Sequence, residues 1–313
     1  MTSPMPPART SSGAAVAPYG GFTRTGWILF AIMSVVWGIS YLFIKEAVAS
    51  YSPAAVVAGR TLIGGLVLLP FALRSGALGA AWRLWPWVLV FGAIEMAGPF
   101  LLLGHAEMRL PSGLTGLLVA TVPLFGTLIA LLRGDRSAVA PLRLAGLAMG
   151  FAGVAIVVAG PGLVPPEAGG VLAVGEVLLT ALLYAIAPFV IATKLSHVPS
   201  LGAITLALFM IGLAYLPAAL LTSHDVPTAR ATVSLVVLGA LCTGLAFVAF
   251  FALISEVGPV RAPLFTYVNP MVAVALGAVL LAEPVTPALL IGFPVVLVGC
   301  WLAATGGRLR RVA

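Results

Sequence analysis

Ten stretches of about 20 predominantly apolar residues divide this chain, and they limit its fold more than any other feature. A helix needs about 20 such residues to cross the hydrocarbon core of a bilayer. The ten stretches are residues 26–49, 53–73, 85–107, 112–132, 142–160, 170–192, 200–221, 232–254, 260–281 and 286–305. We therefore expect an all-α, multi-pass protein of the plasma or inner membrane, surrounded by lipid.

Composition and missing motifs exclude several other classes of protein. Only 8% of the residues are charged, against about 25% in soluble domains, so neither a solvated surface nor a disordered chain can be built. The two lysines, Lys45 and Lys194, follow Ile44 and Thr193, so no nucleotide-binding P-loop is encoded. No hydrolase or metalloprotease motif occurs, and both cysteines lie in apolar stretches. We expect no enzyme activity, no cofactor and no metal site.

Positive charge is distributed unequally between the two sides of the expected bundle. Twelve Lys and Arg residues fall on the side of both termini, and three fall on the other side. The three are Lys45, Arg109 and Arg230. Because positive residues accumulate in cytoplasmic loops, both termini are predicted to be cytoplasmic. The net charge of +7 is thereby explained without a nucleic-acid partner.

The sequence repeats itself at an offset of 147 residues. The matched positions are Gly65, Leu66, Leu69 and Pro70 with Gly212, Leu213, Leu216 and Pro217, Trp37 with Tyr184, Phe100 with Phe247, and Pro123 with Pro270. We predict a disordered tail (1–25), two five-helix repeats (26–160 and 170–305) and a basic tail (306–313). Because five is odd, the second repeat enters the membrane in the opposite sense, as in carriers that work by alternating access.

Several of these residues carry a resemblance to a known family. They are Trp37-Gly38-x-x-Tyr41, Arg60, Pro123, Pro270 and Gly258-Pro259-x-Arg261-Ala262. From about residue 26 to 305 the chain resembles the EamA-type members of the drug/metabolite transporter superfamily. The resemblance implies ten helices in two inverted repeats and the efflux or exchange of small polar metabolites such as amino acids. The chain departs from it at Gly134-Asp135-Arg136 and Ala282-Glu283-Pro284, where that family usually has Gly-Glu-Arg.

Charged residues inside spans are costly and need a reason, and Arg60 and Glu95 are the deepest. They could form a structural ion pair. Alternatively, Arg60 could hold a substrate carboxylate through its planar fork of donors, and Glu95 could carry a proton. His105 and Glu176 lie nearer the outer ends of their spans, where we expect interfacial or gate residues.

Aromatic, amide and hydroxyl groups form a second set at mid-depth. These are Trp37, Tyr41, Tyr184, Tyr267 and Asn269, with Thr121, Thr180 and Thr243 near the same level. Either they bond across helices as packing contacts, or they line a substrate cavity. Tyr267 and Asn269 lie roughly 200° apart on a helix, so they can face one cavity only if that helix is distorted.

Prolines and glycines mark the remaining features. Pro123 and Pro270 are expected to kink matching helices, either as a packing bend or as a hinge or gate. The small residues of the fifth and tenth spans are expected to form packing surfaces outside the cavity, or a homodimer contact. These residues are Gly146, Gly150, Gly153, Gly292 and Gly299.

Together these features predict a secondary transporter that exports or exchanges a small metabolite through a central cavity between the repeats, by alternating access. Coupling to protons is compatible with it. A multidrug or lipid-like efflux carrier and a non-transporting membrane scaffold are the two alternatives.

Overall fold

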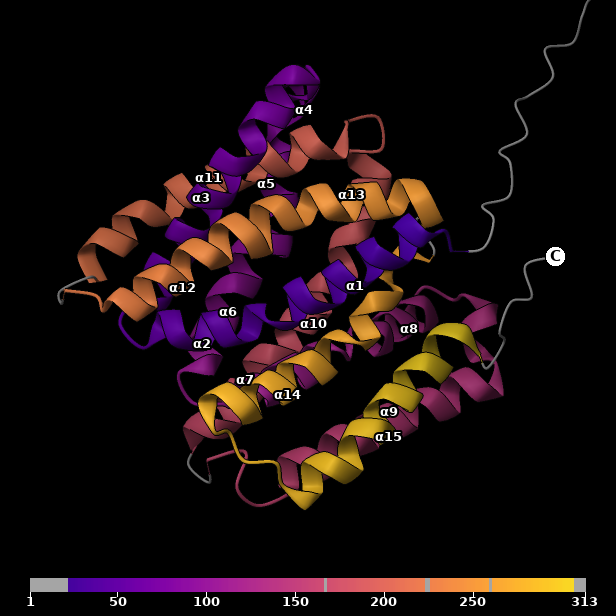
Figure 1. Cartoon of the computed structure of the whole chain (residues 1–313). Helices are drawn as coiled ribbons and strands as arrows, with labels where there is room; N and C mark the ends of the chain where they lie inside the picture. Colours follow the sequence, from indigo (N-terminus) through magenta and orange to yellow (C-terminus); the bar gives the residue numbers. More distant parts are fainter. Residues whose placement is uncertain (1–21, 166–167, 223–225, 259–260, 307–313) are drawn as a thin grey trace, which may run out of the picture.

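All ten apolar stretches are helical in the computed structural model, which describes residues 22–165, 168–222, 226–258 and 261–306 (Figure 1). Each is long and apolar enough to cross a membrane. The ten helical spans are Arg24–Val48, Pro53–Arg74, Trp85–Glu107, Ser112–Leu132, Pro141–Ala159, Gly169–Lys194, Ser200–Thr222, Ala229–Val257, Ala262–Leu281 and Pro287–Thr305. They agree with the expected boundaries to within three residues. The proposed tails lie almost entirely outside the described residues.

Five spans are single helices, and the other five are interrupted. The continuous ones are α3 (Pro53–Arg74), α9 (Pro141–Ala159), α10 (Ala168–Lys194), α11 (Ser200–Thr222) and α15 (Pro287–Thr305). The interrupted ones are α1 (Arg24–Gly38) with α2 (Ser40–Val48); α5 (Trp85–Gly92), η1 (Ala93–Ala97) and α6 (Gly98–Glu107); α7 (Ser112–Val119) with α8 (Val122–Leu132); α12 (Ala229–Gly239), η3 (Ala240–Leu245) and α13 (Ala246–Val257); and η4 (Ala262–Tyr267) with α14 (Asn269–Leu281). Outside the spans lie α4 (Ala77–Arg83) and η2 (Arg136–Val139).

Hydroxyl side chains begin four of these helices. Thr23, Ser52, Thr228 and Thr286 each accept a hydrogen bond from a main-chain N–H of the first turn of α1, α3, α12 and α15. Such caps satisfy donors that have no partner inside the helix. In α3 and α15 a proline follows the cap directly, where its missing N–H has no cost.

Corresponding helices of the two repeats pack against each other in opposite directions. Ser52, at the start of α3, bonds to Thr222 at the end of α11, and Thr61 lies beside Gly212 farther along the pair. The fifth and tenth spans, α9 and α15, likewise run antiparallel, with Gly150 against Gly299. The two repeats are therefore inverted.

The glycines of α9 and α15 pack against other helices of the same chain. A side chain added at Gly146, Gly153, Gly292 or Gly299 would meet atoms of the facing helix, and one added at Gly150 would meet Leu124 of α8. They form the predicted packing surface. Because helices of the same chain cover the faces of these glycines, the packing alternative is the one that the structure supports, and a homodimer stays a prediction.

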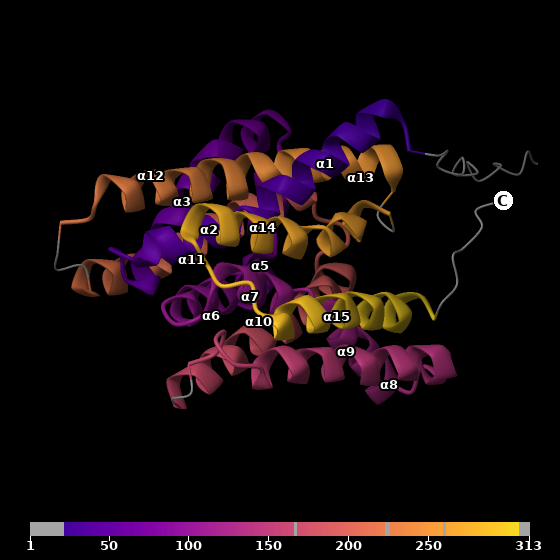
Figure 2. The same ribbon diagram turned by 60° about the horizontal axis from the view of Figure 1, so that its bottom comes forward.

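The remaining helices obey the same approximate twofold relation. α1 packs on α13, and α6 packs on α10, while α7 and α14, which match each other, lie side by side (Figure 1). The start of α1 and the end of α15 lie at one end of the bundle (Figure 2). We call it the proximal end, and the opposite end, with residues 49–52, 108–111 and 282–286, the distal end.

Pro123 and Pro270 interrupt their spans more completely than the expected kinks. Pro123 is the second residue of α8, which starts after a two-residue break from α7. Pro270 is the second residue of α14, which follows the 3-10 helix η4. The expected distortion at each proline is therefore present as a complete break, and the role of these prolines as a hinge or gate stays a prediction. Each proline lies in the first turn of a new helix, where it is tolerated.

Candidate functional site

Arg60 is held at the interface between the two repeats. Its side chain is on α3 and only 8% of the residue is exposed. The Nε donates a hydrogen bond to Thr243 Oγ1 of the second repeat at 2.9 Å, and Thr243 in turn donates to the Leu238 carbonyl. The guanidinium lies 3.6 Å from the centroid of the Phe100 ring. A buried cation that is stacked and hydrogen-bonded in this way has a fixed orientation.

Most of the hydrogen-bonding capacity of Arg60 is unused. A guanidinium has five N–H donors, and only the Nε bond to Thr243 is formed within the described residues. The expected ion pair with Glu95 is absent there as well, so that interpretation was wrong. Glu95 is partly exposed and lies on the π-helix η1. The planar fork of Arg60 is therefore free to bind an anion.

Two tyrosines from different repeats complete the surroundings of Arg60. Tyr41 of α2 and Tyr184 of α10 both interact electrostatically with the guanidinium and with each other. Tyr184 also interacts with Glu95. The structure thus brings five of the predicted site residues together around the repeat interface. We call Arg60, Thr243, Tyr41, Tyr184 and Glu95 the central cluster.

Trp37 and Asn269 lie beside this cluster in packing contacts. The Trp37 Nε1 donates to the Cys242 carbonyl at 3.2 Å, and its ring packs against three phenylalanines, the nearest being Phe265 at 5.2 Å. With its amide nitrogen turned to donate, Asn269 reaches the carbonyls of Phe265 and Ser34 at 3.0 and 3.1 Å. These bonds fix the break between η4 and α14.

Tyr267 lies on the other side of that break. Its hydroxyl interacts electrostatically with Cys300 of α15, whereas Asn269 contacts α1. The helix is distorted between the two residues, but the distortion does not bring them onto one common surface. Of the two residues, Asn269 is the one that contacts the first span, which carries Trp37 and Tyr41.

Two π-helical segments place polar groups in the central cluster. η1 carries Glu95 and η3 carries Thr243, and the two segments match at the 147-residue offset. A π-helical turn adds a residue to an α-helix, rotates the side chains that follow and frees main-chain groups, and it occurs often at functional sites. Hydropathy gave no signal for either segment.

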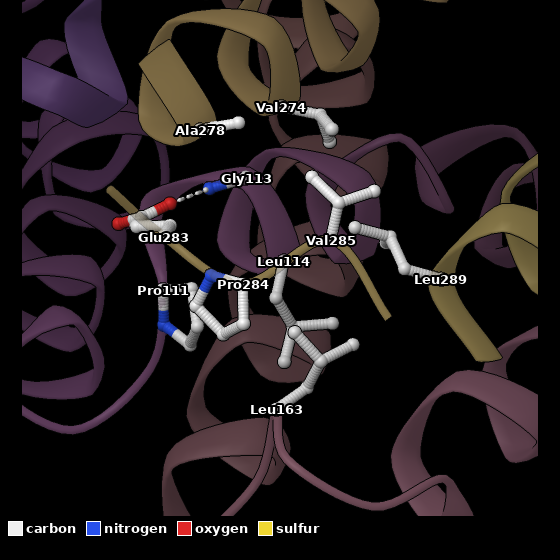
Figure 3. Close-up of a pocket in the computed structure, with 10 residues that line it drawn as sticks. All are labelled: Pro111, Gly113, Leu114, Leu163, Val274, Ala278, Glu283, Pro284, Val285 and Leu289. Atoms are coloured by element: carbon white, nitrogen blue, oxygen red, sulfur yellow. Dashed lines mark hydrogen bonds between the residues drawn. The ribbon is translucent and has the colours of Figure 1, made fainter. Parts of the chain in front are cut away.

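Cross-repeat contacts close the distal end. Glu283, between α14 and α15, accepts hydrogen bonds from the Ser112 N–H and hydroxyl at 2.7 and 3.0 Å. It also accepts one from the Gly113 N–H at 3.1 Å (Figure 3). The carboxylate thereby caps the N-terminus of α7 from the other repeat. The space left there is about 10 Å³, too small for any solute larger than water.

Further polar pairs join the repeats near this end. Arg230 binds Glu46, with Nη2 to Oε1 at 2.7 Å. The two predicted gate residues contact each other, with His105 Nδ1 at 2.6 Å from Glu176 Oε1. Arg109, which can only donate, lies 3.3 Å from His105 Nε2, so that nitrogen is the acceptor and the ring proton lies on Nδ1.

Sequence reasoning missed Lys45, Glu107 and Glu283 as candidate functional residues. Each lies at the end of an apolar stretch, where exposure to water was expected. Instead Glu107 is fully buried, and Lys45 Nζ bonds the main-chain carbonyls of Glu107 and Leu110. What marks these three residues is that they cluster at one end of the bundle. The sequence alone does not show this clustering, because it depends on the three-dimensional arrangement.

Comparison with known proteins agrees with this architecture. The EamA-like transporter family matches residues 24–159 and again 170–305. The chain is 29% identical to the uncharacterized transporter YvbV of Bacillus subtilis, covering 93% of this chain and 95% of that protein. It is 27% identical to the uncharacterized inner membrane transporter YedA of Escherichia coli K12, over 80% of each chain.

Two further similarities concern a named exporter and a solved fold. A probable terminal-alkyne amino-acid exporter of Streptantibioticus cattleyicolor is 26% identical, covering 90% of this chain and 93% of that one. A crystal structure with 21% identity aligns with a TM-score of 0.63, covering 89% of this chain and 96% of the other. The double family match, the ten spans and the inverted repeats together place this multi-pass plasma membrane protein in the EamA-like transporter family.

Proposed function

We propose that the chain exports or exchanges a small metabolite that carries a carboxylate, such as an amino acid, by alternating access at the central cluster. The free donors of Arg60 are the observation that carries this proposal, because a buried, oriented guanidinium binds a carboxylate through two parallel hydrogen bonds. The similarity to a protein named as a probable amino-acid exporter supports the same substrate class.

The other predicted residues are assigned roles around that contact. Tyr41, Tyr184 and Thr243 orient the substrate, Trp37 and Asn269 support the wall of the site, and Glu95 can bind its amino group or a proton. Tyr267 stays a candidate on the α15 side. The breaks at Pro123 and Pro270 act as hinges, and the His105–Glu176 pair belongs to the distal gate.

The orientation of the carrier is part of the proposal. The excess of Lys and Arg at the proximal end supports a cytoplasmic location for that end. The contacts of Glu283, Glu46 and Glu176 then close the outer side. This arrangement corresponds to the state that takes up substrate from the cytoplasm.

A ligand screen followed by a transport assay tests the proposal. Purified protein is heated with amino acids, nucleobases, sugars or cationic dyes, and a ligand of the native state raises the melting temperature. Each hit and its carboxamide analogue are then compared in proteoliposome counterflow. We expect saturable counterflow with the carboxylate and little with the amide. Equal transport of both, or transport of dyes alone, would favour a drug or lipid-like carrier, and no counterflow with any probe would favour a scaffold.

A further inference from the structure

Glu107, a carboxylic acid that the proposed transport cycle does not use, is enclosed near the distal end. It is the last residue of α6, its exposure is 0%, and neither carboxyl oxygen has a hydrogen-bond partner within the described residues. Buried polar groups are almost always hydrogen-bonded, so this one needs an explanation. A carboxylate there would lose its hydration without compensation, whereas a neutral carboxyl group loses much less.

Lys45 of α2 does not neutralise this group directly. Its ammonium donates to the main-chain carbonyls of Glu107 and Leu110 at 2.6 and 2.9 Å. The Glu107 carbonyl is at the end of α6, where a cation is stabilised by the helix dipole, and Leu110 lies in the loop that follows. Lys45 therefore attracts the carboxyl group electrostatically but leaves both of its oxygens without a hydrogen bond.

The other ionisable groups around Glu107 come from both repeats. Arg60 of α3 attracts it, and Glu283 of the second repeat repels it. Tyr41 of α2 also interacts with it. On the face of α6 that packs on α10, His105 is occupied by Glu176, and Glu95 of η1 interacts with Tyr184 at the central cluster.

Closing the distal end brings Glu107 and Glu283 within electrostatic range. Glu283 is bound to Ser112 and Gly113, at the start of the helix that follows Glu107 after a short loop. Two ionised carboxylates in such proximity repel each other, so a proton on Glu107 favours the closed arrangement. When the repeats separate, water can reach Glu107 and stabilise its ionised form.

We propose that Glu107 is a proton-binding site that takes up a proton when the distal ends of the repeats close and releases it when they separate. Proton binding is thereby tied to one half of the transport cycle, so the pH on the distal side sets the balance between the closed and the separated arrangement. This inference rests on the alternating access of the proposed function. It adds the proton as a second ligand and Glu107 as the residue that binds it.

Distance measurements across the distal end test the inference without a substrate. Spin labels are attached at Met108→Cys and Val285→Cys, two exposed positions next to Glu107 and Glu283, in a Cys242→Ala, Cys300→Ala background. Electron–electron resonance in lipid nanodiscs then gives the label distance between about pH 5 and pH 9. Raising the pH ionises Glu107, so the population with a long distance should grow. In Glu107→Gln the short distance should persist at every pH.

Two variants serve as controls. Glu256→Gln removes a carboxylate at the proximal end, beside Thr23 at the start of α1, and should retain the pH response. Glu107→Asp keeps a carboxyl group, and should retain the response with a shifted midpoint even if Glu107→Gln fails to fold. A wild-type distance that ignores pH, a response that survives in Glu107→Gln, an unchanged midpoint in Glu107→Asp, or a response lost in Glu256→Gln would overturn the inference. Counterflow of a carboxylate through Arg60 is measured separately, so the two proposals can fail independently.

Discussion

The two repeats share a backbone plan but differ in the chemistry that they carry. Both have a π-helical segment in the third helix of the repeat and a proline-started half-helix in the fourth. Three charged residues of the first repeat have no charged counterpart at the 147-residue offset: Arg60 corresponds to Ala207, Glu95 to Cys242 and Glu107 to Ile254. The common features build the inverted scaffold, and the unique ones are the residues to which we assign the proposed binding of substrate and proton.

The largest effect is expected from removing the cation that only the first repeat has. In Arg60→Gln we expect counterflow of a carboxylate substrate to fall by about 100-fold, since hydrogen bonds to a charged group contribute about 1.5–3 kcal/mol. Arg60→Lys keeps the charge but not the fork, and should lose about tenfold. The initial rate of radiolabelled substrate exchange in proteoliposomes measures both.

A matched control for this prediction is Ala207→Gln at the corresponding place in the second repeat, on α11. If it reduces exchange as strongly as Arg60→Gln while both proteins stay folded, the binding chemistry is not confined to the first repeat. The interpretation of the central cluster would then need to change.

A scaffold feature shared by both repeats should affect folding instead. In Gly299→Val the new side chain would meet the backbone of α9 at Gly150, and overpacking of this kind costs about 1–3 kcal/mol. We expect a lower melting temperature and a lower yield of monodisperse protein. Gly175→Ala on α10 is the control, because no atom lies within 4 Å of its added Cβ. An equally stable Gly299→Val protein would contradict the tight helix pair.

This contrast also explains how much the sequence could predict. The spans, the repeat and the small-residue faces follow from hydropathy and spacing, which are local properties. The sequence left an Arg60–Glu95 ion pair open as one of two alternatives, because depth along a helix was estimated without its rotation, and η1 changes the rotation at Glu95. Glu107 was missed because its burial depends on elements from both repeats, including Lys45 and the Glu283 loop.

The contribution of the distal end to closure can be tested with a substitution at Glu283. Glu283→Gln keeps the shape of the side chain but removes the charge that caps α7, and such a contact is worth about 1–2 kcal/mol. We expect the distal-open population to rise by about 5- to 30-fold. Labelling of Leu163→Cys by a membrane-impermeant maleimide measures this population, because Leu163 is buried and lines the same small pocket as Glu283 (Figure 3).

Asp135→Asn, at the proximal end, is the matched control for Glu283→Gln, because Asp135 occupies the corresponding acidic position after the fourth span. It should not accelerate labelling of the distal cysteine. Acceleration by both variants would indicate general loosening of the bundle, and acceleration by neither would show that the cap of α7 does not hold the distal end closed.

The smallest effect is expected at Thr243, the residue of the second repeat that contacts Arg60 of the first repeat. Thr243→Val removes the oxygen that accepts from Arg60 Nε, but the guanidinium keeps its position over Phe100. One such bond contributes about 1 kcal/mol, so the half-saturating substrate concentration should rise by about fivefold with little change in maximal rate. Thr243→Ser keeps the hydroxyl and should behave like the wild type. Thr243 orients Arg60 from the opposite repeat. If Thr243→Val lowers the maximal rate instead of the affinity, this contact takes part in the conformational change. The second repeat would then contribute to the transport cycle as well as to the scaffold.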